Sequence, residues 1–328
     1  MKSSALTIGS RGSDLALWQA RWVESEIRSI APKCDVSIEV IRTKGDRILD
    51  SPLSMIGDRG LFTREIEEAL LSGRIDCAVH SLKDLPTVLP PGLCLGASCR
   101  RGEVRDVFIP HPDNPVRTLL EQKPGASIAT GSLRRRSQIL SKRPDFRIVD
   151  IRGNLNTRMN RLGESDWAGM ILACAGVTRL GWDERIGEII PVEVMLPAVG
   201  QGAIGVEIRT GDTETGSLIA RLNDDSTARA VEAERALLHA LEGGCQVPIG
   251  AYARMETGAA GGLQKTGESG VLHIEALVAS LDGRTVVRGR THGLPSGAGE
   301  MGKALAETLL AGGADRILRD IRSGGPGA

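Results

Sequence analysis

The amino-acid sequence predicts two α/β lobes followed by a small α+β domain. Short apolar runs alternate with segments of helical period over the first two hundred residues, as in sheets that are covered by helices. Two groups of prolines divide this region into separate parts. The last third differs, because it carries a long helix, a β-hairpin and a closing helix.

The first lobe begins with a strand at 5–9 and a helix at 14–30, whose apolar residues recur on one face. A second helix at 63–72 has Thr63 as its N-cap and Gly73 just past its end. Further apolar runs predict buried strands at 36–42, 75–79 and 93–97. We expect these strands to form a mostly parallel sheet with helices packed against it.

The second lobe repeats this alternation of strands and helices. Its predicted strands lie at 127–130, 147–151 and 170–173, and its predicted helices at 133–142 and 156–162. An apolar strand at 203–209 is then expected to return to the sheet of the first lobe. The resulting division places domain 1 at 1–101 and 203–222, domain 2 at 102–202, and domain 3 at 223–328.

The third domain combines helices with one hairpin. Its predicted elements are a helix capped by Ser226 that runs to Glu242, a hairpin over 272–280 and 285–290 with an Asp282-Gly283 turn, and an amphipathic helix at 301–311. The Gly-rich stretch 257–270 is typical of a surface loop.

Composition excludes several classes of protein. Lys and Arg together number 41 and are balanced by 41 Asp and Glu, which argues against a general nucleic-acid-binding protein. No apolar run reaches 18 residues, so no membrane span is expected, and the first residues lack the apolar core of a secretory signal. The six cysteines are scattered without a C-x-x-C pair, which predicts a reduced, cytoplasmic protein without a zinc site.

Each lobe contains a strand that ends in small polar residues just before a helix begins. These stretches are 8–13 and 128–135. Exposed N–H groups at a helix start attract anions, so the pair of stretches is consistent with an anionic ligand held by both lobes. Ordinary helix capping by Ser and Thr gives the same pattern, and the stretches alone do not decide between the two.

Arginine dominates the cations, with 33 Arg against 8 Lys. A GC-rich genome explains the number but not the positions. Several arginines follow predicted strands of the second lobe, where ligands of parallel sheets collect, and one lies in the first lobe: Arg134, Arg135, Arg152, Arg158, Arg179 and Arg11. We interpret these as an anion-binding set, because guanidinium groups bind carboxylates in a bidentate manner. Arg136 is expected to face solvent.

The stretch from His80 to Pro86 also follows a predicted strand. Asp84 is an acid beside Lys83 and among arginines, so it could stabilise a cationic intermediate or transfer a proton. It could equally be a turn-forming residue before Leu85-Pro86. We interpret His80 as a structural histidine.

Cys245 differs from the other cysteines, because it follows two glycines between a helix end and a new strand. A loop thiol near arginines could have a lowered pKa and act as a nucleophile. A half-buried structural cysteine fits the same position. A cysteine hydrolase is a competing chemistry; His239 is close in sequence, but no orienting third group is evident.

Taken together, the motifs resemble the porphobilinogen deaminase family, and the resemblance covers nearly the whole chain. The matching stretches are Leu15-Ala16-Leu17-Trp18-Gln19-Ala20, Gly60-Leu61-Phe62, His80-Ser81-Leu82-Lys83-Asp84-Leu85-Pro86, Gly131-Ser132-Leu133-Arg134-Arg135, Arg152-Gly153-Asn154, Leu196-Pro197-Ala198-Val199-Gly200-Gln201-Gly202, and Glu242-Gly243-Gly244-Cys245-Gln246-Val247-Pro248-Ile249-Gly250.

The resemblance implies a fold and an activity. The first two domains would be lobes similar to type II periplasmic binding proteins with the active site in the cleft between them, and the third would carry the cysteine. Four porphobilinogen molecules would lose ammonia and join head to tail into hydroxymethylbilane. The chain would grow on a dipyrromethane cofactor, held by a thioether to Cys245, in a protein that we expect to be a monomer. A two-lobe module that binds a small anion is the alternative, and it needs neither Cys245 nor Asp84.

The resemblance also assigns roles to residues. Asp84 would be the catalytic residue that stabilises the cation left when ammonia departs. The residues that match positions binding the cofactor and substrate, or lining the site, are Arg11, Ser13, Arg59, Phe62, Ser81, Lys83, Thr130, Ser132, Arg134, Arg135, Arg152, Arg158, Arg179 and Gln201. Residues 44–60 match a mobile loop, in which Arg59 stands where many members have Lys.

Overall fold

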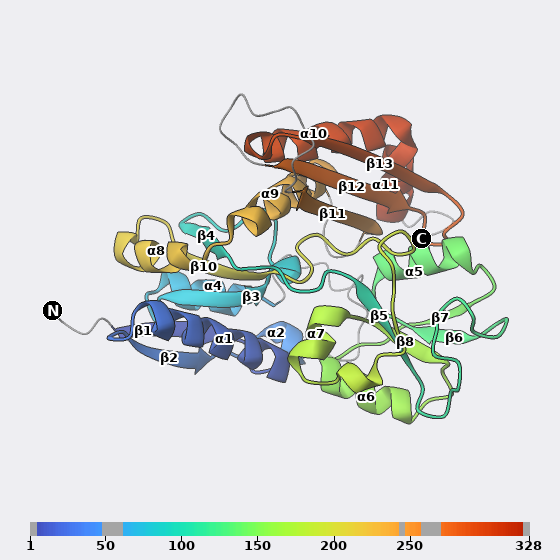
Figure 1. Ribbon diagram of the computed structural model, residues 1–328, viewed down its shortest axis with the longest axis horizontal. Helices are drawn as coiled ribbons and strands as arrows, with labels where there is room; N and C mark the ends of the chain where they lie inside the picture. The colour runs from blue at the N-terminus through green and yellow to red at the C-terminus, as the bar shows by residue number, and fades with distance from the viewer. Residues whose placement is uncertain (1–4, 48–61, 243–246, 257–269, 324–328) are drawn as a thin grey trace. The chain divides into compact units, whose positions relative to one another are not determined.

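The computed structural model describes residues 5–47, 62–242, 247–256 and 270–323. The chain forms two compact units. Unit 1 consists of Met1–Gly102 and Gly202–Ala228, and unit 2 consists of Glu103–Gln201 and Arg229–Ala328. The α/β class and the separate α+β region at the end of the chain agree with the sequence (Figure 1). The division into three domains stays a prediction.

Unit 1 is built on a five-stranded sheet with the order β2-β1-β3-β10-β4. The strands are β1 (Ala5–Ser10), β2 (Asp35–Val40), β3 (Cys77–Ser81), β4 (Leu93–Ser98) and β10 (Ile204–Arg209). The helices are α1 (Asp14–Ile30), α2 (Lys44–Arg47), α4 (Arg64–Leu71) and α8 (Thr213–Ile219). The predicted return of the strand at 203–209 to this sheet is confirmed.

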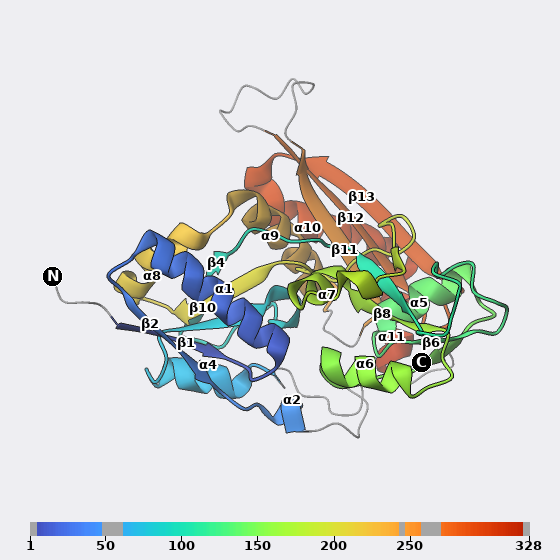
Figure 2. The ribbon, with the colours of Figure 1, turned by 60° about the horizontal axis from the view of Figure 1, so that its bottom comes forward.

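The sheet of unit 1 is mixed, which corrects the expectation of a mostly parallel sheet. β1 runs parallel to β2 and β3, but β10 lies antiparallel between β3 and β4. Helix α1 lies along one face of the sheet (Figure 2). Its buried residues share a core with Cys77 and Val79, whereas α4 shares a core with Ala78. Because successive strand residues point to opposite faces, α1 and α4 cover the two sides.

Unit 2 begins with a second five-stranded sheet, in the order β7-β6-β8-β5-β9, whose pattern of strand directions matches that of the first. Its strands are β5 (Asp106–Pro110), β6 (Ser127–Ala129), β7 (Arg147–Val149), β8 (Gly169–Ala173) and β9 (Glu188–Ile189). Its helices are α5 (Leu133–Lys142), α6 (Leu155–Gly163) and α7 (Cys174–Arg179). β6 is parallel to β7 and β8, whereas β5 is antiparallel to β8 and β9. The sequence does not predict strand β5, because Pro110, at its end, and the nearby Pro112 and Pro115 are typical of a connection between domains.

The rest of unit 2 is an antiparallel sheet with helices on one face. The sheet contains β11 (Ile249–Glu256), β12 (Val271–Ala279) and β13 (Val286–Gly293). The helices are α10 (Ala298–Leu309), α11 (Asp315–Arg322) and α9 (Asp225–Ala240), of which the first four residues belong to unit 1. Helix α10 packs against β12 and β13 (Figure 1). The predicted β12–β13 hairpin is confirmed. The predicted loop at 257–270 lies almost wholly outside the described residues.

The start of α9 differs from the prediction. Ser226 lies inside the helix, and the side chain of Asp224 accepts a hydrogen bond from the Thr227 backbone N–H at 2.8 Å. Asp224 therefore performs the capping that we assigned to Ser226, because a carboxylate satisfies the exposed N–H groups of the first turn as well as a hydroxyl does.

The hairpin turn is held against helix α5. Gly283 has a φ of +72°, and a Cβ atom there would lie 2.4 Å from the Ser141 nitrogen and 2.6 Å from the Ser137 carbonyl oxygen. Only glycine allows this close approach together with this backbone conformation. The turn therefore fixes where the antiparallel sheet meets α5.

We predict that Gly283→Ala destabilises the protein more than Gly211→Ala. Gly211 also has a positive φ, of +86°, but no heavy atom lies within 4 Å of its Cβ position. The conformational cost of about 1–2 kcal/mol is common to both changes, while the clash with α5 adds about 1–3 kcal/mol at Gly283 only. Thermal denaturation tests this prediction, and the Tm of Gly283→Ala should be lower than that of Gly211→Ala. Equal Tm values for the two variants would contradict the close contact.

Candidate functional site

A pocket of about 60 Å³ lies in unit 1. It is bordered by the start of α1 and the turn before it, by the end of β3 and the turn after it, and by the turn before α4. Its lining residues are Arg11, Ser13, Leu15, Ala16, Gln19, Phe62, Thr63, Val79, His80, Ser81 and Asp84. The structure thus brings together five residues of the predicted site, namely Arg11, Ser13, Phe62, Ser81 and Asp84.

Local contacts position the residues of the α1 side. Ser13 is the N-cap of α1, and its hydroxyl accepts a hydrogen bond from the Ala16 N–H at 3.4 Å. The Arg11 guanidinium lies over the Phe62 ring, 4.3 Å from its centroid, in a cation–π contact. The pocket therefore has a cationic and aromatic wall.

Asp84 ends a short 3₁₀ helix, Leu82–Asp84, that directly follows β3. Leu82 is buried, and its N–H donates to the Ala203 carbonyl at 3.0 Å. The Leu85 N–H closes the turn onto the Leu82 carbonyl at 3.2 Å. The carboxyl group of Asp84 is consequently presented to solvent from a fixed turn. Lys83 is half-buried in the same turn.

Six pocket residues were not predicted as functional, and three of them, Gln19, Thr63 and His80, have polar side chains. Gln19 belongs to one of the quoted motifs, and its Nε2 donates to Ser81 Oγ at 2.8 Å. Thr63 was predicted only as a helix cap. His80 was predicted as structural, and its buried ring does contact a buried partner, Glu207, with 3.2 Å between Nε2 and Oε2. Long-range packing, which local sequence does not display, brings these side chains to the pocket.

The arginines of unit 2 follow its parallel strands. β7, β6 and β8 run in the same direction, so their carboxyl ends share one edge of the sheet. Thr130, Ser132 and Arg134 follow β6, Arg152 follows β7, and Arg179 ends the helix that follows β8. The predicted grouping at strand ends is therefore present within unit 2.

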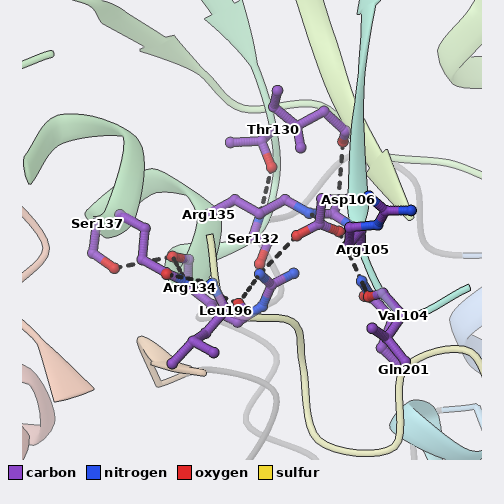
Figure 3. A network of polar contacts seen from close by, with 12 residues as sticks. Val104, Arg105, Asp106, Thr130, Ser132, Arg134, Arg135, Ser137, Leu196 and Gln201 are labelled. Atoms are coloured by element: carbon purple, nitrogen blue, oxygen red, sulfur yellow. Dashed lines mark hydrogen bonds and ion pairs between the residues drawn. The ribbon is translucent and has the colours of Figure 1, made fainter. Parts of the chain in front are cut away.

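The loop after β6 is packed tightly against the segment after β7. A Cβ atom on Gly131 would lie 2.6 Å from the Ile151 carbonyl oxygen. Thr130 is buried, and its hydroxyl accepts a hydrogen bond from the Ser132 N–H at 3.3 Å (Figure 3). Arg158 donates from Nε to the Gly153 carbonyl at 2.9 Å. The motifs around Gly131 and Gly153 thus form one packed edge.

One buried carboxylate, Asp106 on β5, binds two of the arginines (Figure 3). Arg134 Nη1 donates to Asp106 Oδ2 at 2.8 Å, and Arg135 Nη2 donates to Oδ1 at 2.8 Å. Gln201 Nε2 adds a third donor to Oδ1 at 2.9 Å. Asp106 is 0% exposed, and Arg134 and Arg135 are 4% and 5% exposed. Arg136, in contrast, is exposed as predicted.

The two arginines explain why the buried carboxyl group of Asp106 stays ionised. Burial alone raises the pKa of Asp106, but the charges and hydrogen bonds of Arg134 and Arg135 outweigh it and hold that pKa well below its usual range. Burial lowers the pKa of Arg134, and the charge of Asp106 opposes this effect. Two cations and one anion leave a net charge of +1, which is suited to an anionic ligand.

Residues 196–201 form a segment, here called the strap, that is hydrogen-bonded to several elements of unit 2. The Leu196 carbonyl accepts hydrogen bonds from Arg134 Nη1 at 2.7 Å and Gln138 Nε2 at 3.0 Å. The buried carboxylate of Glu234, on α9, accepts from the N–H groups of Gly200 and Ala253 at 2.7 Å each. The strap therefore joins α5, α9 and β11, and through Gln201 it reaches Asp106.

Some of the predicted site residues lie outside the part of the chain that the structure describes. Cys245 and Arg59, with most of the predicted mobile loop, lie outside the described residues. Among the described residues, no group of three or more His, Cys, Asp or Glu side chains could hold a metal ion. In the same part of the chain, no helix has the length and apolar character needed to cross a membrane.

Comparison with known families identifies the relationship. The family model "Porphobilinogen deaminase, dipyromethane cofactor binding domain" matches residues 6–217, and "Porphobilinogen deaminase, C-terminal domain" matches residues 228–311. The chain belongs to the porphobilinogen deaminase family. Porphobilinogen deaminase of Desulfitobacterium hafniense is 48% identical over 319 residues, which cover 97% of this chain and 98% of that protein. Porphobilinogen deaminase of Chlorobium phaeobacteroides is 49% identical over 321 residues, with the same coverage.

Solved structures of other proteins are similar only at low sequence identity. The aliphatic sulphonate binding protein SsuA of Escherichia coli has a TM-score of 0.38 at 15% identity, covering 73% of this chain and 71% of that chain. The LysR family transcriptional regulator CbnR has a TM-score of 0.42 at 14% identity, covering 68% of this chain and 71% of that chain. The porphobilinogen deaminase assignment depends on the sequence matches.

We predict that Asp106→Asn destabilises the protein by about 3–5 kcal/mol, because it leaves two buried guanidinium groups without their counter-charge. Urea denaturation measures this loss. The matched control is Asp145→Asn, which removes the partner of Arg143 in a solvent-exposed ion pair. The control should cost much less, since exposed ion pairs contribute little. Equal losses in the two variants would contradict the role given to Asp106.

The same ion pair predicts how stability depends on pH. Because the pKa of Asp106 is lower in the folded protein than in the unfolded chain, its contribution is complete above the unfolded value of about 3.9 and is lost as the pH falls through the folded value. The stability difference between wild type and Asp106→Asn should therefore be constant above about pH 5 and shrink below pH 4. A difference that grows on acidification would refute this assignment.

Proposed function

We propose that this porphobilinogen deaminase works with Asp84 as its catalytic carboxylate and with Cys245 as the attachment point of its cofactor. Enzymes of this family are transferases that condense four porphobilinogen molecules into hydroxymethylbilane and release ammonia, in tetrapyrrole biosynthesis. The dipyrromethane cofactor of the family supplies, when bound, the pyrrole end on which the new chain is built. The observation that carries the proposal is the pocket in which Asp84 lies with Arg11, Ser13 and Ser81.

Asp84 can stabilise positive charge. When ammonia leaves porphobilinogen, the remaining methylene-pyrrole unit is cationic, and a carboxylate held close to it lowers the energy of that state. The 3₁₀ turn supports this role because Leu82 anchors it and leaves the Asp84 side chain at the pocket. The carboxylate needs little reorganisation during the reaction, which is the condition for efficient electrostatic catalysis.

The arginine-rich edge of unit 2 fits the carboxylates of the substrate and the cofactor. Porphobilinogen carries an acetate and a propionate, so a dipyrromethane carries four carboxylates. Guanidinium groups suit such ligands because they bind carboxylates through two parallel hydrogen bonds. We assign this binding to Arg134, Arg135, Arg152, Arg158 and Arg179, with Thr130, Ser132 and Gln201 beside them. In the pocket and its turn, Arg11, Ser13, Phe62, Ser81 and Lys83 are assigned to the same ligands, as is Arg59.

The surroundings of the enzyme are also part of the proposal. We propose a monomer that acts in the cytoplasm on a small molecule and not on nucleic acid. The zero net charge supports the last point. The described cysteines, at 34, 77, 94, 99 and 174, are all free thiols, which supports a reducing compartment.

We predict that Asp84→Asn lowers turnover by about 10²–10³-fold while the protein stays folded and keeps its cofactor, because the amide cannot stabilise the cation as the carboxylate does. Single-turnover release of ammonia measures the effect. Asp113→Asn is the matched control, since the Asp113 side chain is 93% exposed. The control should keep wild-type turnover. Near-wild-type turnover of Asp84→Asn would show that the catalytic residue is another one.

We predict that Cys245→Ala cannot hold the cofactor covalently, because the thioether needs the sulfur atom. Denatured and washed wild-type protein should give a coloured product with Ehrlich's reagent, which detects pyrroles, and the variant should not. Cys94→Ala is the control, since Cys94 lies on β4 and not in the Cys245 motif. A wild-type colour in the Cys245→Ala variant would exclude this cysteine as the attachment point.

A further inference from the structure

The last helix of the chain makes a polar contact with the end of α9, close in sequence to Cys245. Helix α11 ends at Arg322, which lies beyond residues 228–311, the region that the C-terminal family model matches. Cys245 is the third residue after Glu242, where the chain leaves α9. The proposed chemistry gives no role to Arg322.

The guanidinium group of Arg322 binds three oxygen atoms of two consecutive residues. Its Nη1 donates to Glu242 Oε2 at 2.9 Å, and its Nη2 donates to the Leu241 carbonyl at 3.1 Å and to the Glu242 carbonyl at 3.3 Å. The last carbonyls of a helix lack partners within the helix, and a positive charge is favourable at this end of the helix dipole. Arg322 therefore holds both the backbone and the side chain at the end of α9.

Glu242 has a backbone conformation that is rare for a residue with a side chain. Its φ is +49°, and among the described residues it is the only one other than glycine with a positive φ. Many helices end with such a left-handed residue, but that residue is usually glycine. A glutamate keeps this conformation where its surroundings hold it in place. The three hydrogen bonds from Arg322 provide this support at the residue that turns the chain out of α9.

Helix α11 is anchored independently of its terminal arginine. Ile317 and Leu318 of α11 belong to the same buried core as Leu241, at the end of α9, and Ile249, at the start of β11. The ion pair itself is exposed, with 42% of the arginine side chain and 74% of the glutamate side chain accessible to solvent. Because exposed ion pairs contribute little to stability, the contact is better explained by the conformation that it fixes.

We propose that Arg322 is a positioning residue for the cofactor, because it holds Glu242 in the conformation that directs the chain toward Cys245. This inference rests on the proposed function, in which Cys245 is the attachment point. The other flank of the segment is also fixed, since the Pro248 carbonyl accepts a hydrogen bond from the Ala279 N–H at 3.2 Å. With both flanks fixed, the covalent reach of the chain limits the positions of the thioether sulfur. A reacting group with fewer accessible positions reaches the reactive geometry more often.

The test measures kcat and KM of the holoenzyme for porphobilinogen, together with hydrogen–deuterium exchange at the end of α9. In Arg322→Ala, kcat should fall by about 5–30-fold, because misplacement of a reacting group slows the reaction. KM should change by less than about twofold, since the contacts that bind the substrate remain. The amide hydrogens of Leu241 and Glu242 should exchange faster than in the wild type.

Arg319→Ala is the matched control. Arg319 lies one turn earlier on α11 and pairs with Asp315 of the same helix, and 71% of its side chain is exposed. The control should keep the wild-type kcat and the wild-type exchange at the end of α9. An equal fall of kcat in both variants would overturn the proposal, because the effect would then belong to α11 in general.

Glu242→Ala tests the same contact from its other side and leaves the packing of α11 unchanged. It should lower kcat at a similar KM, and its effect should be smaller in an Arg322→Ala background, because the contact is already lost there. Additive effects of the two substitutions would overturn the proposal. Should Arg322→Ala fail to fold, Glu242→Ala still provides the test, and a wild-type kcat in that variant would be contradictory.

The mass of the peptide that contains Cys245 separates failure of this inference from failure of the proposed function. A wild-type peptide without pyrrole mass would refute the attachment point and, with it, the role of Arg322 toward the cofactor. Pyrrole mass on that peptide, combined with wild-type kcat and exchange in Arg322→Ala, would refute the role of Arg322 alone.

Discussion

The geometry of the arginine-rich edge in unit 2 depends on the charge of a single buried carboxylate. Asp106 accepts hydrogen bonds from Arg134, Arg135 and Gln201, and it lies on β5, next to β8 in the sheet. Without this anion, two adjacent guanidinium groups would be buried side by side with no compensation. With it, the two guanidinium groups keep fixed positions and a net positive charge remains. The carbonyls of Leu196 and Ile171 accept further hydrogen bonds from these arginines, so both side chains are held in one conformation.

The same ion pairs connect the edge to the rest of unit 2. Arg134 binds both Asp106 and the Leu196 carbonyl, so helix α5 is fixed to the strap. Glu234, on α9, binds the other end of the strap and the backbone of β11. In the sequence, Cys245 lies between the end of α9 and the start of β11. The long motif from Leu196 to Gly202 is therefore explained by its contacts, since its backbone and its glutamine side chain serve three elements at once. A change in Asp106 should affect the position of the strap as well as that of the arginines.

Local sequence patterns predicted the longest helices well but not the short helices α7, α8 and α11, and they missed strand β5 and the antiparallel direction of β10. The bounds of α1 and α5 agree with prediction, because apolar period and end signals are encoded within each segment. Asp106 was missed, since it precedes Arg134 by 28 residues and lies on a strand that ends in the first of three closely spaced prolines, which are typical of a connection. Glu207 was missed because it lies within an apolar strand, and only the antiparallel pairing of β10 with β3 brings it to His80. Side chains that act together across such pairings leave no local signal, whereas Asp84 could be proposed from the sequence because it belongs to a motif that directly follows a strand.

The central claim is that this chain carries a pyrrole cofactor and extends it with porphobilinogen. The most direct measurement is the intact mass of the wild-type protein under denaturing conditions, before and after incubation with a few equivalents of porphobilinogen. We predict a starting mass that exceeds the sequence mass by two linked pyrroles, followed by species that differ by one pyrrole unit each. A starting mass equal to that of the sequence, unchanged by porphobilinogen, would contradict the claim.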